Sequence, residues 1–381
     1  MNLSIYFEPL REEHDGIYAD HRTLGGNTER FVTKFPDWRE ADLAFFGINE
    51  IRGSNLPPSA GFSAHAIRKK LFAMKRRTGR SRIVDLGTLR PGITLEDTYL
   101  RIKEIVEMLI SHNTIPILIG GSHDLDYGQF LAYENLDQPV NLVMIDSRMD
   151  MSEDPEVVQN RQHLHRILMH EPNFLFSFSQ IAYQTYLVEH EVITTLEKLY
   201  FDTYRVGEVH KDIEAIEPAV RHANLLSFDI SAMRTQDAPG YEPANPFGLT
   251  GEEACQLCWY AGANDHLSSI GIYEYNPDLD GRHLTAMTIA TMIWYFIEGY
   301  YHRKNEVDFQ SKNFTKYAVG FHDNPHKMVF YKSRNSDKWW MEVEKLYGRR
   351  QVSVVPCSYE DYLQAAKGEV PQRWILTQAR M

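Results

Sequence analysis

The sequence is poor in the features that mark disulfide-rich, membrane and secreted proteins. Only three of its 381 residues are cysteines, too few for a disulfide framework. The longest apolar run, Thr285 to Ile297, is shorter than the roughly 20 residues that cross a bilayer. The first residues, MNLSIYFEPLREEHDG, lack a basic segment followed by an apolar stretch, so no signal peptide is expected. These absences predict a reduced protein of the cytoplasm.

Positive charge is also scarce. The chain has 40 Lys and Arg against 52 Asp and Glu, a formal net charge of −12. Nucleic acids and anionic membranes recruit clustered Lys and Arg, so neither is expected as a partner. We find no internal repeat and no low-complexity segment. The 43% hydrophobic content is that of an ordinary globular protein, long enough to bury a full core.

Two of the cysteines form a C-x-x-C motif, Cys255 and Cys258, with no second pair to complete a zinc site. The motif lies in GLTGEEACQLCWY, which predicts the start of a helix with Thr250 as cap and Glu253 three residues later. Both thiols then lie one turn apart on a buried face. Inert core thiols are the expectation, and a redox motif is the alternative.

From Asp42 to about Tyr300, short apolar segments alternate with helical patterns. Strands are predicted at 42–48, 81–86, 115–121, 140–146, 224–230 and 266–277, and helices at 63–77, 94–112, 192–199 and 285–300, besides the Cys-bearing one. In the 94–112 helix, Leu100, Ile105, Met108 and Leu109 are expected to face the core. This alternation is typical of a parallel sheet covered by helices on both faces.

The last 80 or so residues do not continue this alternation of strands and helices. Segments 317–321, 328–332 and 339–344 are predicted as short strands and 359–368 as a helix, with many aromatic residues including Trp339 and Trp340. We expect this tail to pack on the preceding domain. A surface for a partner or for oligomerisation is the alternative.

Ionisable side chains follow four of the predicted strands. His123 follows IPILIGG, Asp146 and Asp150 follow LVMI, Asp229 follows LLSF, and Glu274 follows IGIY. Ligands of open parallel sheets bind outside the carboxyl ends of the strands. Each residue alone could be a helix cap or a core histidine, but four strand ends together indicate a site. One imidazole among carboxylates suits Mn²⁺ or Mg²⁺.

The segments GGSHD, MIDSRMD, SFDIS, GLTGEE and IYEYNP, followed by Leu284-Thr285-Ala286, together resemble the ureohydrolases: arginase, agmatinase and formimidoylglutamase. The resemblance runs from about residue 42 to 300. It implies a three-layer αβα sandwich with an eight-stranded parallel sheet, an arginase-like domain over 1–300, and a C-terminal extension over 301–381. It also implies hydrolysis of non-peptide C–N bonds in linear amidines at two Mn²⁺ ions.

The resemblance assigns metal ligands residue by residue. In the family's G-G-D-H-S motif the His binds the first ion, and in D-A-H-x-D and S-F-D-x-D the Asp and His residues bind one or both ions. Here the central His of the second motif is Arg148, and the second Asp of the third motif is Ser231. The complete ligand set of the first ion remains: His123, Asp146, Asp150 and Asp229.

The family pattern also suggests catalytic residues, with Asp150 among them. Glu274 stands where family members orient the guanidinium or formimino group. A proton-relay His follows the second motif in arginases, and His163 stands thirteen residues after Asp150, with His165 as a rival.

Charge balance suggests what replaces the second ion. Four Asp and two divalent ions sum to zero, and so do three Asp, Arg148 and one divalent ion. We therefore expect the Arg148 guanidinium to occupy the second ion's place, paired with Asp146 or Asp229. At most one Mn²⁺ is expected, and an ion-free site is the alternative.

Three functional hypotheses follow. The first is a degenerate ureohydrolase that binds a small guanidino or formimino compound or acts in assembly. The second is an active hydrolase of the formimidoylglutamase or arginase type that uses one metal, Arg148 as electrostatic partner and His163 as acid/base. The third is an interaction protein that works through its tail. The resemblance also implies a homo-oligomer.

Overall fold

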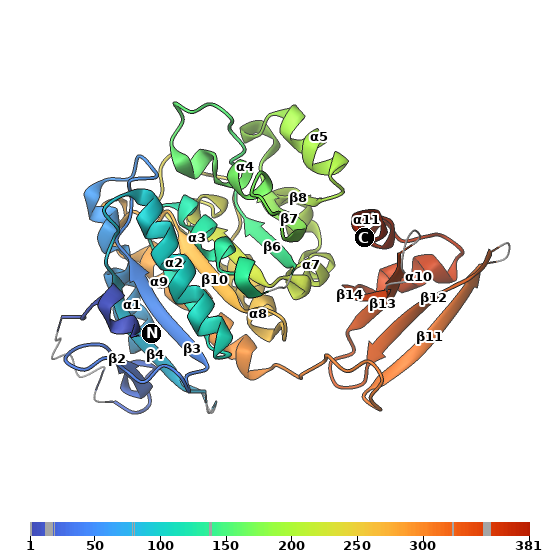
Figure 1. Cartoon of the computed structure of the whole chain (residues 1–381), viewed down its shortest axis with the longest axis horizontal. Coiled ribbons are helices and arrows are strands. Elements are labelled where there is room, and N and C mark those ends of the chain that lie inside the picture. Colours follow the sequence, from blue (N-terminus) through green and yellow to red (C-terminus); the bar gives the residue numbers. More distant parts are fainter. Residues whose placement is uncertain are drawn as a thin grey trace.

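A large, mostly parallel sheet forms the centre of the molecule (Figure 1). The structure, a computed structural model, describes residues 2–11, 18, 20–77, 79, 81–136, 139–321, 324–345 and 352–381. Eight parallel strands run in the order β4-β3-β5-β10-β9-β6-β7-β8. Their bounds are β3 Leu43–Ile48, β4 Ile83–Leu89, β5 Ile115–Ile119, β6 Val140–Ile145, β7 Leu175–Tyr183, β8 Asp202–Arg205, β9 Leu225–Asp229 and β10 Ser269–Tyr273.

Two short strands complete the sheet at the β4 edge. Strand β1 (Phe7–Glu8) pairs antiparallel with β4, and β2 (Thr28–Arg30) pairs parallel with it. The first 40 residues, which show little pattern in the sequence, thus add two strands to the eight that were predicted.

Helices cover both faces of the sheet and bury two separate apolar cores. One core contains side chains of α1 (Ser63–Ala73), α6 (Val206–Lys211), α7 (Glu217–His222), α8 (Gly251–Ala263) and α9 (Leu284–Tyr301). The other contains side chains of α2 (Leu95–Ser111), α3 (Asp126–Leu131), α4 (His163–Leu168) and α5 (His190–Lys198). This arrangement confirms the predicted three-layer α/β fold.

The helix starts follow local sequence rules, but one predicted face is partly wrong. Thr94 and Thr250 each cap a helix through a reciprocal capping box. Cys255 and Cys258 are buried in α8, and burial raises the pKa of Cys255 to about 12, which supports inert thiols. In α2, however, Leu100 is 51% exposed, because the buried stripe passes through its neighbours Tyr99, Ile102 and Val106.

The C-terminal region forms a second, antiparallel sheet in the order β11-β12-β13-β14. These strands are β11 Phe314–Phe321, β12 Asn324–Ser333, β13 Trp339–Glu344 and β14 Val352–Cys357, followed by α10 (Tyr359–Ala366) and α11 (Gln372–Arg380). It has its own apolar core, which includes Phe330, Trp339 and Met341. Three strands and α10 match the predicted elements, whereas β14 and α11 were not predicted.

The two sheets meet at α7. The buried guanidinium of Arg221 donates to the carbonyl oxygens of Trp339 and Cys357 and lies 4.3 Å from the ring centroid of Trp340. Glu217 of α7 pairs with Lys338 of the C-terminal region.

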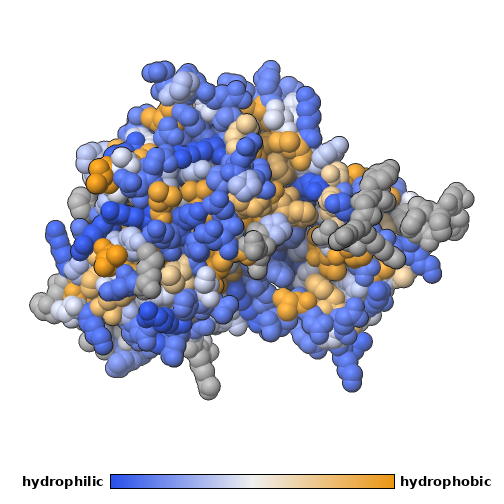
Figure 2. All heavy atoms as spheres, in the orientation of Figure 1, coloured by the Kyte–Doolittle hydropathy of each residue, from blue (hydrophilic) through white to orange (hydrophobic). Residues whose placement is uncertain are grey.

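Figure 2 shows a mostly hydrophilic face with scattered apolar groups. Among the described residues we find no helix that combines the length and apolar character needed to span a bilayer.

Candidate functional site

The four central strands bring the predicted residues together at one edge of the sheet. In spatial order, β5 leads to His123, β10 to Glu274, β9 ends in Asp229, and β6 leads to Asp146 and Asp150. All five side chains are buried. Because parallel strands end on the same side, residues more than 150 positions apart in the chain become neighbours.

Four of these residues point their ligand atoms at one another. Nδ1 of His123 lies 3.2 Å from Oδ2 of Asp146, 3.2 Å from Oδ2 of Asp229 and 3.9 Å from Oδ2 of Asp150. One ligand atom from each of the four residues lies within 4.8 Å of all the others. Burial disfavours a charged imidazole, but the Asp146 and Asp229 carboxylates outweigh it and raise the pKa of His123 well above its ordinary value.

Hydrogen bonds behind His123 fix which of its nitrogens faces this cluster. Ser227 donates to Oδ2 of Asp126 (2.9 Å), so its oxygen accepts from Nε2 of His123 at 2.8 Å. In the neutral imidazole, the form that binds a metal ion, the lone pair of Nδ1 then faces the carboxylates. Nδ1 and the Oδ2 atoms of Asp146 and Asp150 are buried without a hydrogen-bond partner. A divalent cation would satisfy all of them, and the nitrogen and oxygen donors suit Mn²⁺.

The opposite oxygens of the shared carboxylates are already hydrogen-bonded. Oδ1 of Asp146 accepts from the Ser231 hydroxyl (2.8 Å) and from the backbone N–H of Arg148 (2.8 Å). Oδ1 of Asp229 accepts from the backbone N–H of Ser231 at 2.6 Å. Ser231 therefore contacts both carboxylates where family members place a second carboxylate ligand.

The guanidinium of Arg148 does not fill that place. In the described part of the chain, no carboxylate lies within ion-pairing distance of it, and only its backbone N–H contacts Asp146. The expected pairing with Asp146 or Asp229 is therefore wrong. The Oδ1 atoms of Asp146 and Asp229 instead accept hydrogen bonds from the Ser231 hydroxyl and from the backbone N–H groups of Arg148 and Ser231.

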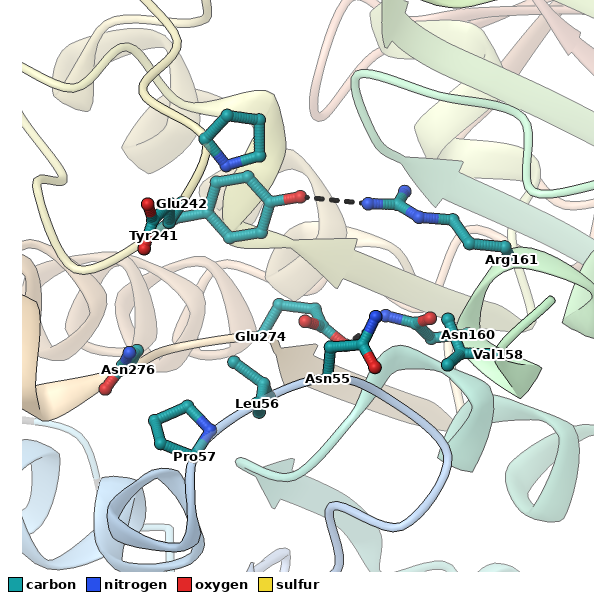
Figure 3. A pocket seen from close by; sticks show the side chains of 11 residues that line it. Asn55, Leu56, Pro57, Val158, Asn160, Arg161, Tyr241, Glu242, Glu274 and Asn276 are labelled. Carbon is teal, nitrogen blue, oxygen red and sulfur yellow. Dashed lines mark hydrogen bonds between the residues drawn. The ribbon is translucent and has the colours of Figure 1, made fainter.

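A different guanidinium faces the cluster, that of Arg161. Its Nη1 lies 3.0 Å from Oδ1 of Asp150, and its Nη2 donates to the Tyr241 hydroxyl at 3.3 Å (Figure 3). Arg161 and Asn160 come from a single 3₁₀ turn, Gln159–Arg161. The positive charge beside the cluster thus comes from Arg161, in the loop that follows Asp150, and not from Arg148.

Glu274 lies in a cavity of about 340 Å³ beside the cluster (Figure 3). Its Oε1 accepts from the backbone N–H of His123 (2.8 Å) and from Nδ2 of Asn160 (3.0 Å). Burial and the Asp229 charge raise the pKa of Glu274 to about 8. The lining also includes Arg161, Tyr241 and Glu242, with Asn55, Leu56, Pro57, Val158, Pro243 and Asn276.

His163 lies behind the cluster rather than in this cavity. It is 1% exposed, its Nδ1 lies 2.7 Å from Oδ1 of Asp126, and its Nε2 lies 3.5 Å from Oδ2 of Asp150. This position favours a role in orienting Asp150 over a proton relay to a ligand in the cavity. His165 is partly exposed and faces Glu153 at 3.9 Å, away from the cluster.

The structure adds residues that sequence reasoning missed. Asp126, Ser227, Asn160 and Arg161 contact predicted site residues, and Tyr241 accepts a hydrogen bond from Arg161. The sequence does indicate Asp126, because GGSHDLD places a second carboxylate three residues after His123. The others follow no motif that the sequence displays.

Curated relatives of this chain are formimidoylglutamases. That of Bacillus subtilis (strain 168) is 24% identical over 308 residues, which cover 71% of this chain and 93% of the relative. That of Staphylococcus aureus (strain MSSA476) is 22% identical over 286 residues, which cover 67% and 91%.

Solved structures with the same fold include two of that kind. Trypanosoma cruzi formiminoglutamase with Mn²⁺ has a TM-score of 0.65 at 19% identity, and the match covers 71% of this chain and all of that one. Bacillus subtilis formimidoylglutamase has a TM-score of 0.68 at 17% identity, covering 77% and 97%. The model of the arginase family matches residues 41–298, well over half of the sequence. The chain therefore belongs to the arginase family.

Proposed function

We propose that this protein holds a single divalent ion, Mn²⁺ by preference, and binds a small guanidino or formimino compound beside it. The ligands of the ion are His123, Asp146, Asp150 and Asp229. Hydrolysis of C–N bonds in linear amidines, for which family members use two ions, is lost or strongly reduced. The protein then acts by binding its ligand.

The hydrogen bonds that Ser231 donates to Asp146 and Asp229 are the main support for this proposal. Its hydroxyl and backbone N–H occupy the Oδ1 atoms of Asp146 and Asp229, the oxygens left over after the first ion's ligand set is complete. A second ion would have to displace these hydrogen bonds and would find neither the His nor the second Asp of the family motifs. A lone ion supplies Lewis acidity, but a water shared by two ions is the stronger nucleophile.

The cavity chemistry supports a cationic ligand. Glu274 and Glu242 line it, and only one oxygen of Glu274 is used by protein donors. A cationic group placed beside Glu274 favours its charged form, in which the free oxygen accepts the N–H groups of a guanidinium or formimino group. Arg161 stands on the same wall and keeps Asp150 oriented toward the ion.

Metal content and turnover test the proposal together. After dialysis against Mn²⁺, we expect one ion per chain in the wild type and less than one in Asp229→Ala. Urea, ammonia and formamide release from formimino-glutamate, arginine and agmatine should not exceed the level of that variant. Turnover that Asp229→Ala abolishes would instead establish an active single-metal hydrolase. The homo-oligomer implied by the family stays a prediction.

A further inference from the structure

A second cavity, of about 220 Å³, lies around Arg148, and two of its lining residues, Ser147 and Ser231, belong to the hydrogen-bond network of Asp146. We infer that it binds a small carboxylate ligand with a flat apolar body. The inference concerns a site distinct from the Glu274 cavity, although Tyr241 and Pro243 contribute to the walls of both.

Charge favours an anion in this cavity. Arg148 is the only charged side chain among its lining residues, and none of them is a carboxylate, in a protein whose net charge is −12. Within the described residues the Arg148 guanidinium has neither a hydrogen-bond nor an ion-pair partner. A guanidinium with all its donors free pairs with a carboxylate through two parallel hydrogen bonds.

The base of the Arg148 side chain is held in place. Its backbone N–H donates to Asp146, and its carbonyl oxygen accepts from Nε2 of Gln180 at 2.8 Å. Asn245 lies in the same wall, where one hydrogen of Nδ2 bonds the Ser231 carbonyl and leaves the other for a ligand. Only the long side chain of Arg148 therefore has to be ordered on binding.

The two serine hydroxyls that line the cavity have no hydrogen left to donate to a ligand. Ser147 donates to Ser231 (3.0 Å), and Ser231 donates to Asp146 (2.8 Å), so both hydroxyl hydrogens are used inside the protein. Arg148 and Asn245 remain as donors toward the cavity, together with the Tyr241 hydroxyl, which accepts from Arg161 and keeps its own hydrogen. The two substitutions that remove the second ion's ligands, at 148 and 231, are thus the ones that build this wall.

Apolar side chains form the rest of the lining. They include Leu187, Pro246 and Phe247, with Tyr186 at the rim. Phe247 and Tyr186 are 69% and 67% exposed, which is unusual for rings that flank a cavity. A flat apolar group would cover them. The volume lies below the roughly 300 Å³ at which typical ligand pockets begin, which favours a ligand of about one ring and one carboxylate.

Benzoate is a suitable probe. We expect the full-length protein to bind it in isothermal titration calorimetry, and Arg148→Gln to weaken binding by about tenfold or more because a charge-assisted bidentate pair is lost. Arg282→Gln, at an exposed arginine that lines neither cavity, is the matched control and should bind as the wild type does. Equal affinity of Arg148→Gln and wild type would overturn the inference.

Two further titrations distinguish binding in this cavity from binding to the metal ion and from binding by charge alone. Titrations run with and without Mn²⁺ should agree; benzoate binding that needs Mn²⁺ and survives in Arg148→Gln would mean that the probe binds the ion. Inorganic phosphate should bind more weakly than benzoate, and Phe247→Ala should weaken benzoate only. Equal binding of both anions, unchanged in Phe247→Ala, would contradict the apolar part of the site. Because metal loading is measured separately, failure here leaves the proposed function standing.

Discussion

At the scale of single residues, Asp126 does most to define the candidate metal centre without being one of the four proposed ligands. One of its oxygens accepts from Ser227, which in turn accepts from His123, and the other lies 2.7 Å from Nδ1 of His163. A single buried carboxylate thus sets the hydrogen positions on two imidazoles. Their remaining nitrogens, Nδ1 of His123 and Nε2 of His163, have no hydrogen-bond partner and face Asp150.

Replacing Asp126 by Asn should therefore weaken metal binding while leaving all four ligands in place. The amide can donate where the carboxylate only accepted, so one or both imidazoles lose their fixed orientation. We expect the Mn²⁺ affinity to fall by about 10- to 100-fold, the usual effect of removing a group that orients a ligand. Electron paramagnetic resonance of free Mn²⁺ measures it. Asp154→Asn, at an exposed carboxylate, should change nothing, and an unchanged affinity in Asp126→Asn would disprove the role.

The substitutions at 148 and 231 can be reversed. Arg148→His with Ser231→Asp restores the two family ligands and removes the hydroxyl that occupies Oδ1 of Asp146. We expect this double variant to bind two Mn²⁺ ions per chain by elemental analysis, against one in the wild type. Ser231→Asp alone, which still lacks the His, serves as the control and should stay near one. Two ions in the unmodified protein would refute the single-ion proposal.

At the scale of secondary-structure elements, strand ends could be predicted and turns could not. Asp146, Asp229 and Glu274 directly follow apolar runs, so the sheet geometry alone brings them together. Arg161 lies eleven residues beyond Asp150 in a turn of three residues, and no periodicity marks it. The direction of Arg148 also escaped prediction, because it depends on which backbone N–H groups satisfy Asp146.

The contact of α1 with β4 rests on a buried ion pair. Nε and Nη2 of Arg68 lie 2.7 and 3.0 Å from the two oxygens of Asp85, and Nη2 also donates to the Gly87 carbonyl. Arg68→Ala leaves the Asp85 charge buried and unpaired, which should lower the free energy of unfolding by about 3–5 kcal/mol. Urea denaturation measures this loss.

Two controls accompany this measurement. Lys70→Ala, two positions along the same helix, should cost much less, because Lys70 is only partly buried. Arg68→Met combined with Asp85→Leu should recover most of the loss, since an apolar pair needs no charge partner. If Arg68→Ala unfolds at the same urea concentration as the wild type, the pair does not hold the helix on the sheet.

At the scale of the whole molecule, the C-terminal sheet is attached through arginine hydrogen bonds and ion pairs. Arg221 of α7 donates to carbonyl oxygens of this sheet, Lys338 pairs with Glu217 of α7, and Arg380 of α11 lies 3.6 Å from Asp202 of β8. The sequence predicted most strands of this region but not its attachment, because Arg221 pairs with carbonyl oxygens that any sequence provides. These contacts lead us to expect that the C-terminal region depends on the arginase-like domain for part of its stability, and the division of the chain at residue 300 stays a prediction.

His222, at the end of α7, makes this contact sensitive to pH. Burial, followed by the charges of Arg380, His266 and Arg373, lowers its pKa to about 3. In the unfolded chain an ordinary His has a pKa of about 6.5. Below that pH, His222 therefore binds a proton in the unfolded state but not in the folded state. The contribution of His222 to stability should therefore fall as the pH drops from about 7.5 toward 5.

His222→Gln should remove this dependence, because the amide carries no titrating proton. The unfolding temperature of the variant should drop less than that of the wild type between pH 7.5 and 5. His165→Gln, at a partly exposed histidine of α4, should keep the slope of the wild type. Parallel slopes for His222→Gln and the wild type would mean that His222 takes up its proton in the folded protein. Protonation of His222 would then not destabilise the contact, and the stability of the attachment of the C-terminal sheet would not depend on pH in this range.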